Sequence, residues 1–256
     1  MTEKHADFYQ DESLVNVNMN RILLACVVFL GICSATYAQK SDSTKLVVRK
    51  TDDFQVNGNG DNANWTKTDW VRITPQESAG KPYSTKVKLL YSTTGVYFLF
   101  QNDDEKLTAT IREDYGALFK EDVIEVFLWP DQSVPIYFEY ELSPLNYELA
   151  ILVPNINGDF NGWKPWHYEG KSKVQHATSV QGGNKVSKAT VSGWTGEIFI
   201  PYRLLRPLVQ TPPTAGTQWR GNLYRIDYDH SYATWSWQKT SGSFHEFKKY
   251  GTFIFE

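Results

Sequence analysis

Cysteine and methionine are nearly absent from this chain of 256 residues, which contains two of each. Cys26, Cys33, Met1 and Met19 all lie near the N-terminus. The rest of the sequence has no thiol, disulfide or thioether, so its stability must come from packing. The same absence excludes cysteine nucleophiles, thiolate metal sites and haem held by methionine from that part of the chain.

The chain also lacks a strong excess of either charge, with 26 Lys and Arg against 29 Asp and Glu. Charges that are interspersed and nearly balanced give no sign of the positive patch that binds nucleic acid or an anionic membrane, so neither is an expected partner. Aromatic residues are abundant, with 9 Trp, 15 Tyr and 14 Phe. This density is typical of a β-rich domain that either packs flat rings or displays them.

Long hydrophobic runs are missing except near the N-terminus. Arg21 precedes the apolar residues 22–30, a run too short to span a bilayer, and small residues follow before Gln39. The pattern predicts translation from Met19 and a signal peptide cleaved after Ala38. We therefore expect a secreted or periplasmic protein with no transmembrane segment after cleavage.

Cys33 supports a rival interpretation of the same region. Residues 30–33 resemble an export lipobox in which Cys33 carries the lipid, which would tether the protein to the outer membrane. Ile32 is larger than the residue usually needed before that cysteine. We expect residues 1–38 to be an N-terminal extension with its signal peptide, 39–45 a flexible polar leader, and 46–256 one folded domain.

Alternating apolar and polar residues predict many short strands and almost no helix in that domain. Residues 86–91 and 96–100 flank a short loop at 92–95 and should pair antiparallel. Further strands are predicted at 107–112, 123–129, 136–142, 147–153, 174–180, 185–191, 197–200, 223–228 and 252–255, with a helical turn at 202–205. The expected fold is all-β, an antiparallel two-sheet β-sandwich of jelly-roll or immunoglobulin-like type.

Three consecutive predicted strands, within residues 120–153, carry an unusual number of carboxylates. A period of two would place one set of side chains against the core: Ile124, Val126, Leu128, Ile136, Phe138, Tyr140, Leu142, Leu149 and Ile151. The opposite face would carry Glu125, Tyr137, Glu139, Glu141 and Glu148. Neighbouring carboxylates are costly unless cations, water or a hydroxyl-rich ligand satisfy them, so this face is a candidate site.

Seven segments in order give the chain a family resemblance: 54–58 with Trp65, 96–100, 122–128, 137–140, 194–202, 219–225, and 244–245 with 250–255. In this order they resemble carbohydrate-binding module family 9 and the broader DOMON-like superfamily. The resemblance implies a β-sandwich that binds oligo- or polysaccharide between aromatic rings, often with structural calcium. It also implies a non-catalytic role beside secreted polysaccharide-degrading enzymes, in polysaccharide capture or degradation.

The long loop at residues 155–170 contains residue types that suit a sugar. A pyranose ring needs an exposed aromatic plane for its C–H face and polar side chains for its hydroxyl groups. Trp163, Trp166 and Asn161 offer that mixture. The alternative is that both tryptophans fold down and close one end of the sandwich. We assign the remaining tryptophans of patterned segments to the core: Trp65, Trp194, Trp219, Trp235 and Trp237.

Polar candidates for the same site come from the strands. Arg112, close to Tyr115, could donate a fork of hydrogen bonds to adjacent sugar hydroxyls, and the resembling family places an arginine near this point. The alternative for Arg112 is an ion pair with a glutamate. Glu125 and Glu139 could accept hydrogen bonds from the ligand or pair with arginine.

Two alternatives to simple binding concern the carboxylates. Glu125 and Glu139 lie on adjacent predicted strands, where the separations used by glycosidases are possible. A glycosidase needs one acid kept protonated by an apolar pocket, whereas this face is charge-rich, so the sequence favours binding over catalysis. A structural or interaction module without sugar binding is the third alternative. For metal, Asp103 and Asp104 are candidate calcium ligands, although such acidic clusters are also common in solvated turns.

Overall fold

The computed structural model describes residues 44–76, 83–156 and 159–256. The predicted signal peptide, Met19, Cys33 and most of the leader lie outside these ranges. The described strands are β1 (Lys45–Lys50), β2 (Val71–Pro75), β3 (Thr85–Tyr91), β4 (Gly95–Asp103), β5 (Val123–Trp129), β6 (Ile136–Leu142), β7 (Glu148–Pro154), β8 (Lys164–Pro165), β9 (Gln175–Gln181), β10 (Gly193–Pro201), β11 (Gln218–Asp227), β12 (Ala233–Ser236) and β13 (Gly251–Phe255).

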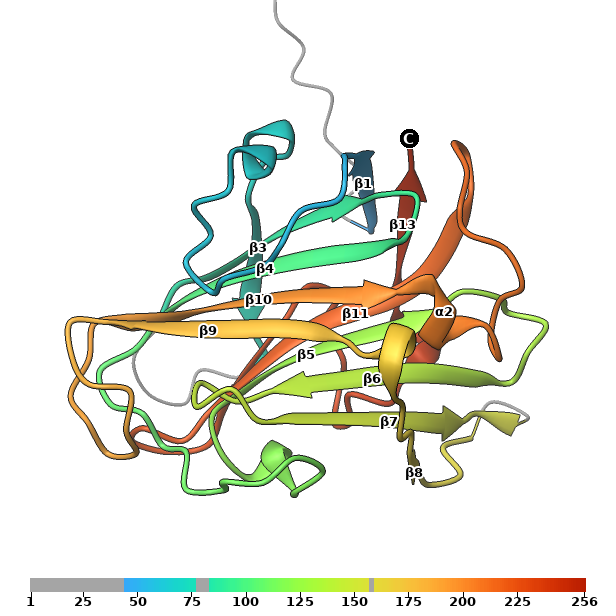
Figure 1. Ribbon diagram of the computed structural model, residues 1–256. Coiled ribbons are helices and arrows are strands. Elements are labelled where there is room, and N and C mark those ends of the chain that lie inside the picture. The colour runs from blue at the N-terminus through green and yellow to red at the C-terminus, as the bar shows by residue number, and fades with distance from the viewer. Residues whose placement is uncertain (1–43, 77–82, 157–158) are drawn as a thin grey trace, which may run out of the picture. The chain divides into compact units, whose positions relative to one another are not determined.

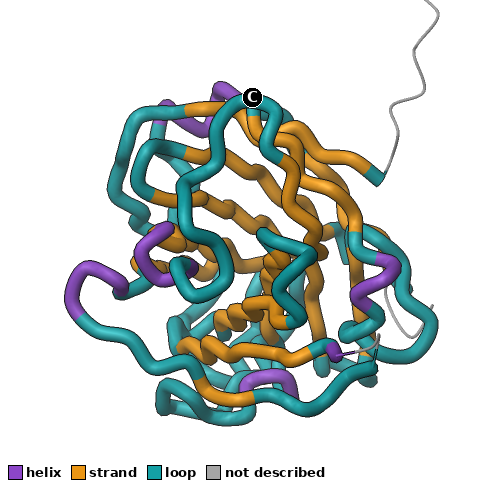
Figure 2. The backbone as a smooth tube through the Cα atoms, turned by 90° about the vertical axis from the view of Figure 1, so that its right-hand side faces the viewer, coloured by secondary structure: helices purple, strands orange, loops and turns teal. Residues whose placement is uncertain are grey.

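Helical structure is confined to short connections, drawn as small purple segments in Figure 2. They are η1 (Ala63–Lys67), η2 (Leu118–Lys120), η4 (Gly170–Ser172), α2 (Tyr202–Leu205) and η5 (Phe247–Lys249). Within the described ranges, none is a helix with the length and apolar character needed to cross a membrane.

The 13 described strands are joined by hydrogen bonds into one continuous sheet, which is described below as two parts, each called a sheet. The glutamate sheet has the order β8-β7-β6-β5-β11-β12, and β13 also pairs with β11. The second sheet has the order β2-β3-β4-β10-β9 (Figure 1). Hydrogen bonds join the two through the β12–β2 pair and through β1, which pairs in parallel with both β13 and β3. The predicted all-β fold is confirmed.

The main core lies between the two sheets. Val126 and Tyr140 of the glutamate sheet belong to the same buried cluster as Phe98 and Ile198 of the second sheet. Each of these strands alternates inward and outward side chains, so one apolar set per sheet meets the other. The prediction for the patterned tryptophans is confirmed: Trp65, Trp194, Trp219 and Trp235 are buried and Trp237 packs partly buried against the core.

Two predicted strands are wrong. Residues 107–112 and 185–191 form no strand, and the one isolated bridge beside them joins Lys106 to Thr190. In residues 107–112, carboxylates accept backbone hydrogen bonds that a neighbouring strand would otherwise accept. Asp122 accepts from the amide of Thr108, and Glu121 accepts from the amide of Ile111. The 86–91 and 96–100 hairpin is confirmed, with Val87 opposite Phe100.

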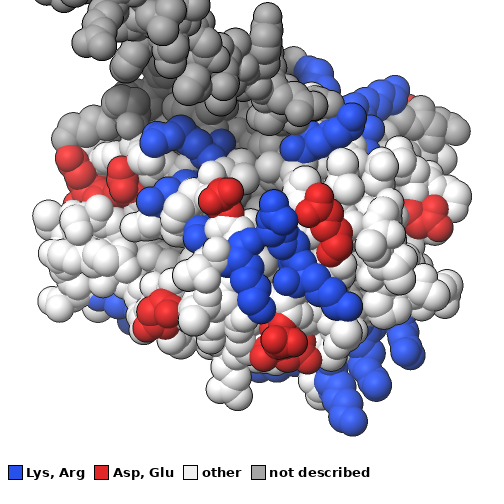
Figure 3. All heavy atoms as spheres, turned by 90° about the horizontal axis from the view of Figure 1, so that it is seen from above, with Lys and Arg blue, Asp and Glu red and all other residues white. Residues whose placement is uncertain are grey.

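One face of the molecule carries charges of both signs. Figure 3 shows one face of the molecule, on which Lys and Arg side chains are interspersed with Asp and Glu. This distribution agrees with the near-neutral charge of the sequence.

Candidate functional site

Three glutamates are brought together by the register of β5 and β6. Glu125 lies directly opposite Glu141, and Phe127 lies opposite Glu139. Directly opposite residues of an antiparallel pair share a face of the sheet. Glu125, Glu139 and Glu141 therefore lie together on the outer face of the glutamate sheet, away from the main core.

The prediction of which β7 side chains face the core is wrong. Leu149 lies opposite Glu141 and Ile151 opposite Glu139, so both belong to the carboxylate face. Glu148 instead lies opposite Leu142 on the inner face. A one-residue difference in register moves every side chain of a strand to the other face.

Glu148 is accommodated on the inner face by polar partners. Its Oε2 accepts hydrogen bonds from the hydroxyl groups of Tyr140, at 2.6 Å, and Tyr168, and it lies 3.4 Å from Nε2 of His176. These contacts satisfy a carboxylate that would otherwise be buried without partners. Glu148 is therefore a structural residue and does not belong to the outer face.

A cleft of about 840 Å³ lies over the outer face of the glutamate sheet. Glu125, Glu139 and Glu141 form part of its floor, and they are only 2%, 4% and 1% exposed. Phe160 and Trp163 line one part of it, and residues 239–245 line another. The volume falls within the range of small-molecule sites, roughly 300 to 1,000 Å³.

Short β8 positions the aromatic wall of the cleft. Lys164 and Pro165 pair with Leu152 and Ile151 of β7, which holds the preceding Trp163 at the edge of the sheet. The Trp163 side chain is 40% exposed. An indole exposed to this extent in a cleft is free to stack on a ligand.

Stacked rings hold the part of the cleft that residues 239–245 line. The ring of Phe244 stacks on Tyr224 at 4.0 Å, and the Tyr224 hydroxyl donates to the Phe244 carbonyl at 2.9 Å. His245 stacks on Phe160 at 4.2 Å, and its Nδ1 lies 2.6 Å from the Tyr137 hydroxyl. These contacts fix the segment that follows β12 over the floor.

Burial dominates the electrostatics of the floor. It raises the pKa of Glu125, Glu139 and Glu141 well above the usual value for glutamate, and repulsion between neighbouring carboxylates raises each further. Each floor glutamate therefore binds its proton more tightly than a free glutamate does.

Two floor oxygens have no hydrogen-bond partner in the described part of the chain, Oε2 of Glu139 and Oε2 of Glu141. Among the described residues, no Lys or Arg forms an ion pair with the three glutamates. Nδ1 of His245 lies 3.7 Å from Oε2 of Glu139, but burial lowers the pKa of His245 to about 4, so its ring is neutral at pH 7. Both carboxyl oxygens are therefore buried acceptors that lack a donor.

The structure brings together some of the predicted site residues. Trp163, Glu125 and Glu139 all line the cleft. Trp166 instead packs half-buried against the main core, which matches the alternative that we considered for it. Asn161 donates from Nδ2 to the carbonyl of Asp159 at 2.9 Å and so holds the loop.

Arg112 and Tyr115 lie outside the lining of the cleft. Arg112 is exposed, and no ion pair with a glutamate is found for it among the described residues. The ring of Tyr115 lies 4.2 Å from that of His167, and its hydroxyl donates to the Trp166 carbonyl at 3.4 Å. Tyr115 therefore supports the loop that carries Trp163.

Sequence reasoning left several lining residues out of the candidate list. The alternation of β6 predicts the correct face for Glu141, which is not among the predicted site residues. Phe160 lies in the loop already singled out, and Phe244 and His245 belong to a segment of the family resemblance. The available signal was their aromatic character in connections; their convergence on one cleft depends on how the connections dock.

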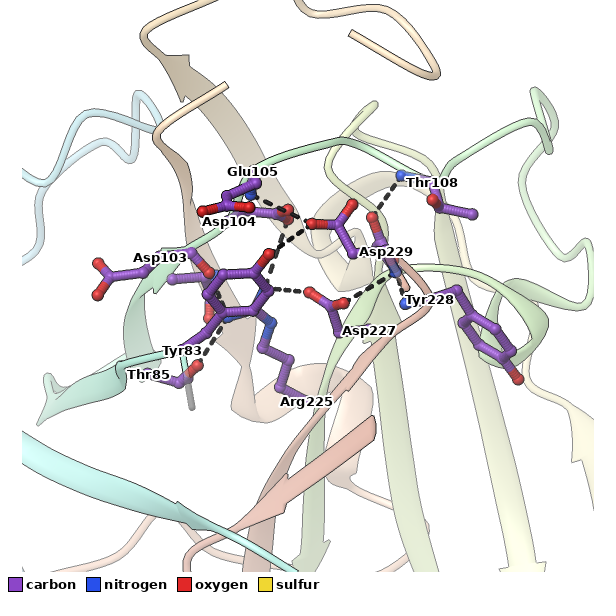
Figure 4. A network of polar contacts seen from close by, with 12 residues as sticks. Tyr83, Thr85, Asp103, Asp104, Glu105, Thr108, Arg225, Asp227, Tyr228 and Asp229 are labelled. Carbon is purple, nitrogen blue, oxygen red and sulfur yellow. Dashed lines mark hydrogen bonds and ion pairs between the residues drawn. The ribbon is translucent and has the colours of Figure 1, made fainter. Parts of the chain in front are cut away.

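The predicted calcium ligands belong to a different network, at the last residues of β4 and β11 (Figure 4). Arg225 donates to Asp227 at 2.5 Å and to Asp104 at 3.3 Å, so its guanidinium group supplies the positive charge between them. Asp103 contributes only its carbonyl, to Arg225 at 2.7 Å. In the described ranges no group of three acidic or histidine side chains has metal-binding geometry, and these residues do not fit a calcium site.

Comparisons with known proteins agree with this architecture. No family model and no curated protein matches the sequence. Solved structures match strongly: the fold is that of carbohydrate-binding module family 9 domains and their neighbours. A candidate carbohydrate-binding protein from Bacteroides uniformis ATCC 8492 superposes with a TM-score of 0.70 at 14% identity, covering 83% of this chain and 99% of that one.

Two structures of a family 9 module from Caldicellulosiruptor kristjanssonii are also similar. The module in complex with glucose has a TM-score of 0.59, and the one in complex with cellotriose has 0.58, each at 15% identity. Each covers 83% of this chain, and the match spans 95% and 93% of the respective modules. At such identities the likeness establishes the fold.

Proposed function

We propose that this protein is a non-catalytic carbohydrate-binding protein and that a saccharide occupies the cleft over the glutamate sheet. The observation that carries the proposal is the combination of an exposed indole, Trp163, with unpartnered carboxyl oxygens of Glu139 and Glu141 in one cleft. The C–H face of a sugar stacks on the indole while its hydroxyl groups donate to the floor. Neighbouring folds in complex with glucose and cellotriose support this choice of ligand.

The N-terminal sequence supports a proposal for where the protein binds its ligand. The predicted signal peptide supports export to the periplasm or the cell exterior, with lipidation at Cys33 as the alternative. There the protein would capture oligo- or polysaccharide and assist enzymes that degrade it. Export is tested by N-terminal sequencing of the secreted protein, which should begin at Gln39 if cleavage follows Ala38.

Sugar binding is tested by affinity electrophoresis against a panel of polysaccharides. Retarded migration in one of these gels should be lost in the Trp163→Ala variant. Trp70→Ala is a matched control, since Trp70 is 38% exposed but lies away from the cleft, near Lys86. Loss of binding in both variants, or in neither, would argue against the cleft as the site.

A glycoside hydrolase is the second candidate function. The observation in its favour is that burial raises the pKa of Glu125 and Glu139, as a general acid requires. Release of reducing ends from the bound polysaccharide, abolished by Glu125→Gln or Glu139→Gln, would establish it. Binding without any release would support the non-catalytic role.

A further inference from the structure

The floor of the cleft contains three buried acids that no cation of the described residues pairs with. Glu125, Glu139 and Glu141 are all more than nine-tenths buried, and they point from two adjacent strands to one outer face. Buried carboxylates are normally paired with a cation or held by several donors. Here Oε2 of Glu139 and Oε2 of Glu141 have neither within the described residues.

No Lys or Arg of the described residues forms an ion pair with the floor glutamates. Lys120 and Lys239 line the cleft, but both side chains are exposed. Arg225 belongs to the opposite face of the sheet, where it pairs with Asp104 and Asp227. The compensating charge for the floor must therefore come from a proton or from the ligand.

We propose that the cleft selects saccharides with a free amino group, a hexosamine unit in place of a neutral hexose, and that the ammonium group is held by Glu139 and Glu141. This inference rests on the proposed function and narrows its ligand class. An ammonium group has three donors and one positive charge, which matches two carboxyl groups with unpartnered oxygens. Trp163 stacks on the same or the adjacent ring.

The size and shape of the cleft favour an amino sugar over a bare cation. The three glutamates do not form a metal-binding group, a statement that holds for the described part of the chain. A volume of about 840 Å³ also exceeds what an ion requires and suits a ligand of a few sugar rings. Trp163 and Phe244 add flat apolar surface that a metal ion does not need.

Calorimetry with three trisaccharides of similar size tests the proposal: β-1,4-linked glucosamine, its N-acetylated form, and cellotriose. The titrations are made at about pH 6, where an amine with a pKa near 8 is protonated. We expect the glucosamine trimer to bind at least about tenfold more tightly than cellotriose, and the acetylated form to lose this advantage. Glu139→Gln and Glu141→Gln should each reduce the preference, whereas Glu169→Gln, at an exposed position, should leave it unchanged.

Proton release gives a second readout. An ammonium group requires an ionised partner, so its binding expels protons held by Glu139 and Glu141, and the measured heat should depend on the ionisation enthalpy of the buffer. Other titratable groups around the floor are Tyr137, Tyr224, Tyr228, Tyr232, Tyr250 and His245, with Lys120 and Lys239 at its edge. Burial raises the pKa of Tyr137, Tyr224, Tyr228 and Tyr250 and lowers that of His245 to about 4, so none of these five is charged at pH 6.

The outcomes are distinguishable. Equal affinity for the three trisaccharides would overturn the amine proposal and leave the sugar-binding function intact. Binding of none of them, nor of any polysaccharide in the electrophoresis panel, would overturn both. Saturable binding of calcium alone, lost in Glu141→Gln, would show that a divalent cation occupies the floor and would also overturn the proposal. Thermal unfolding of each variant confirms that it is folded.

Discussion

Trp65 and Glu197 are joined by a hydrogen bond of 2.7 Å from the indole Nε1 to the carboxylate, on the outer face of the second sheet. The same carboxylate accepts from the backbone amides of Asn57, at 2.8 Å, and Gly58, at 2.6 Å. One side chain of β10 thus holds the segment before η1 over the sheet. This buried glutamate is satisfied by three donors, in contrast with the floor glutamates of the cleft.

Glu197→Gln should destabilise the protein. The amide keeps one acceptor oxygen but directs an NH₂ group at donors, and hydrogen bonds to a charged group contribute roughly 1.5 to 3 kcal/mol each. We expect the free energy of unfolding to fall by about 2 to 4 kcal/mol, measured by urea denaturation. An unchanged midpoint would show that the Trp65 contact does not hold the segment in place.

Arg225→Met should lower the free energy of unfolding more than the simultaneous replacement of Arg225, Asp104 and Asp227 by uncharged residues. Arg225 is fully buried between Asp104 and Asp227, and its loss leaves two buried carboxylates without compensation. Breaking a buried pair in this way costs roughly 3 to 5 kcal/mol. The triple variant Arg225→Met, Asp104→Asn, Asp227→Asn should recover part of the loss in the same denaturation experiment; no recovery would mean that packing of the arginine dominates.

The floor glutamates should make the protein less stable as the pH rises. Their pKa values are raised in the folded protein, so above the ordinary value of 4.5 the folded state binds more protons than the unfolded chain. Their contribution is complete below that value and is lost progressively as the pH climbs toward the folded pKa values. Unfolding midpoints measured from about pH 4.5 to 8 should show this slope.

Glu139→Gln should reduce the slope, because one titrating group is removed from the floor. The control is Glu169→Gln, which removes a carboxylate from an exposed position and should retain it. A slope identical in both variants would assign the pH dependence to other buried acids, such as Asp104, whose pKa burial raises to about 7.

Trp166→Ala and Trp163→Ala should separate stability from binding. Trp166 packs against the main core, so its truncation should lower the free energy of unfolding by about 2 kcal/mol or more. Trp163 is exposed in the cleft, and its loss should change stability by less than about 1 kcal/mol while abolishing retention on polysaccharide. Equal stability losses would show that both indoles are structural.

Local patterns predicted most of the strands, including the hairpin of β3 and β4 and the short helix α2. They failed at residues 107–112, where Asp122 and Glu121 take the hydrogen bonds that a neighbouring strand would make. Local patterns also predicted the wrong face for the residues of β7. Alternation along a strand separates its side chains into two sets, but it does not specify which set faces the core. The position of Glu148 depends on the β6–β7 register and on Tyr140, Tyr168 and His176.

By itself the sequence determined the all-β class, the order of most strands, the absence of thiol chemistry after the N-terminal region, and the presence of glutamates on β5 and β6. These depend on composition and on a period of two, which are local properties of the chain. Only the tertiary structure decided that Trp163 and not Trp166 lines the cleft, and that Phe160, Phe244 and His245 converge over Glu139. Those choices depend on strand register and on the docking of connections far apart in sequence, which no local pattern specifies.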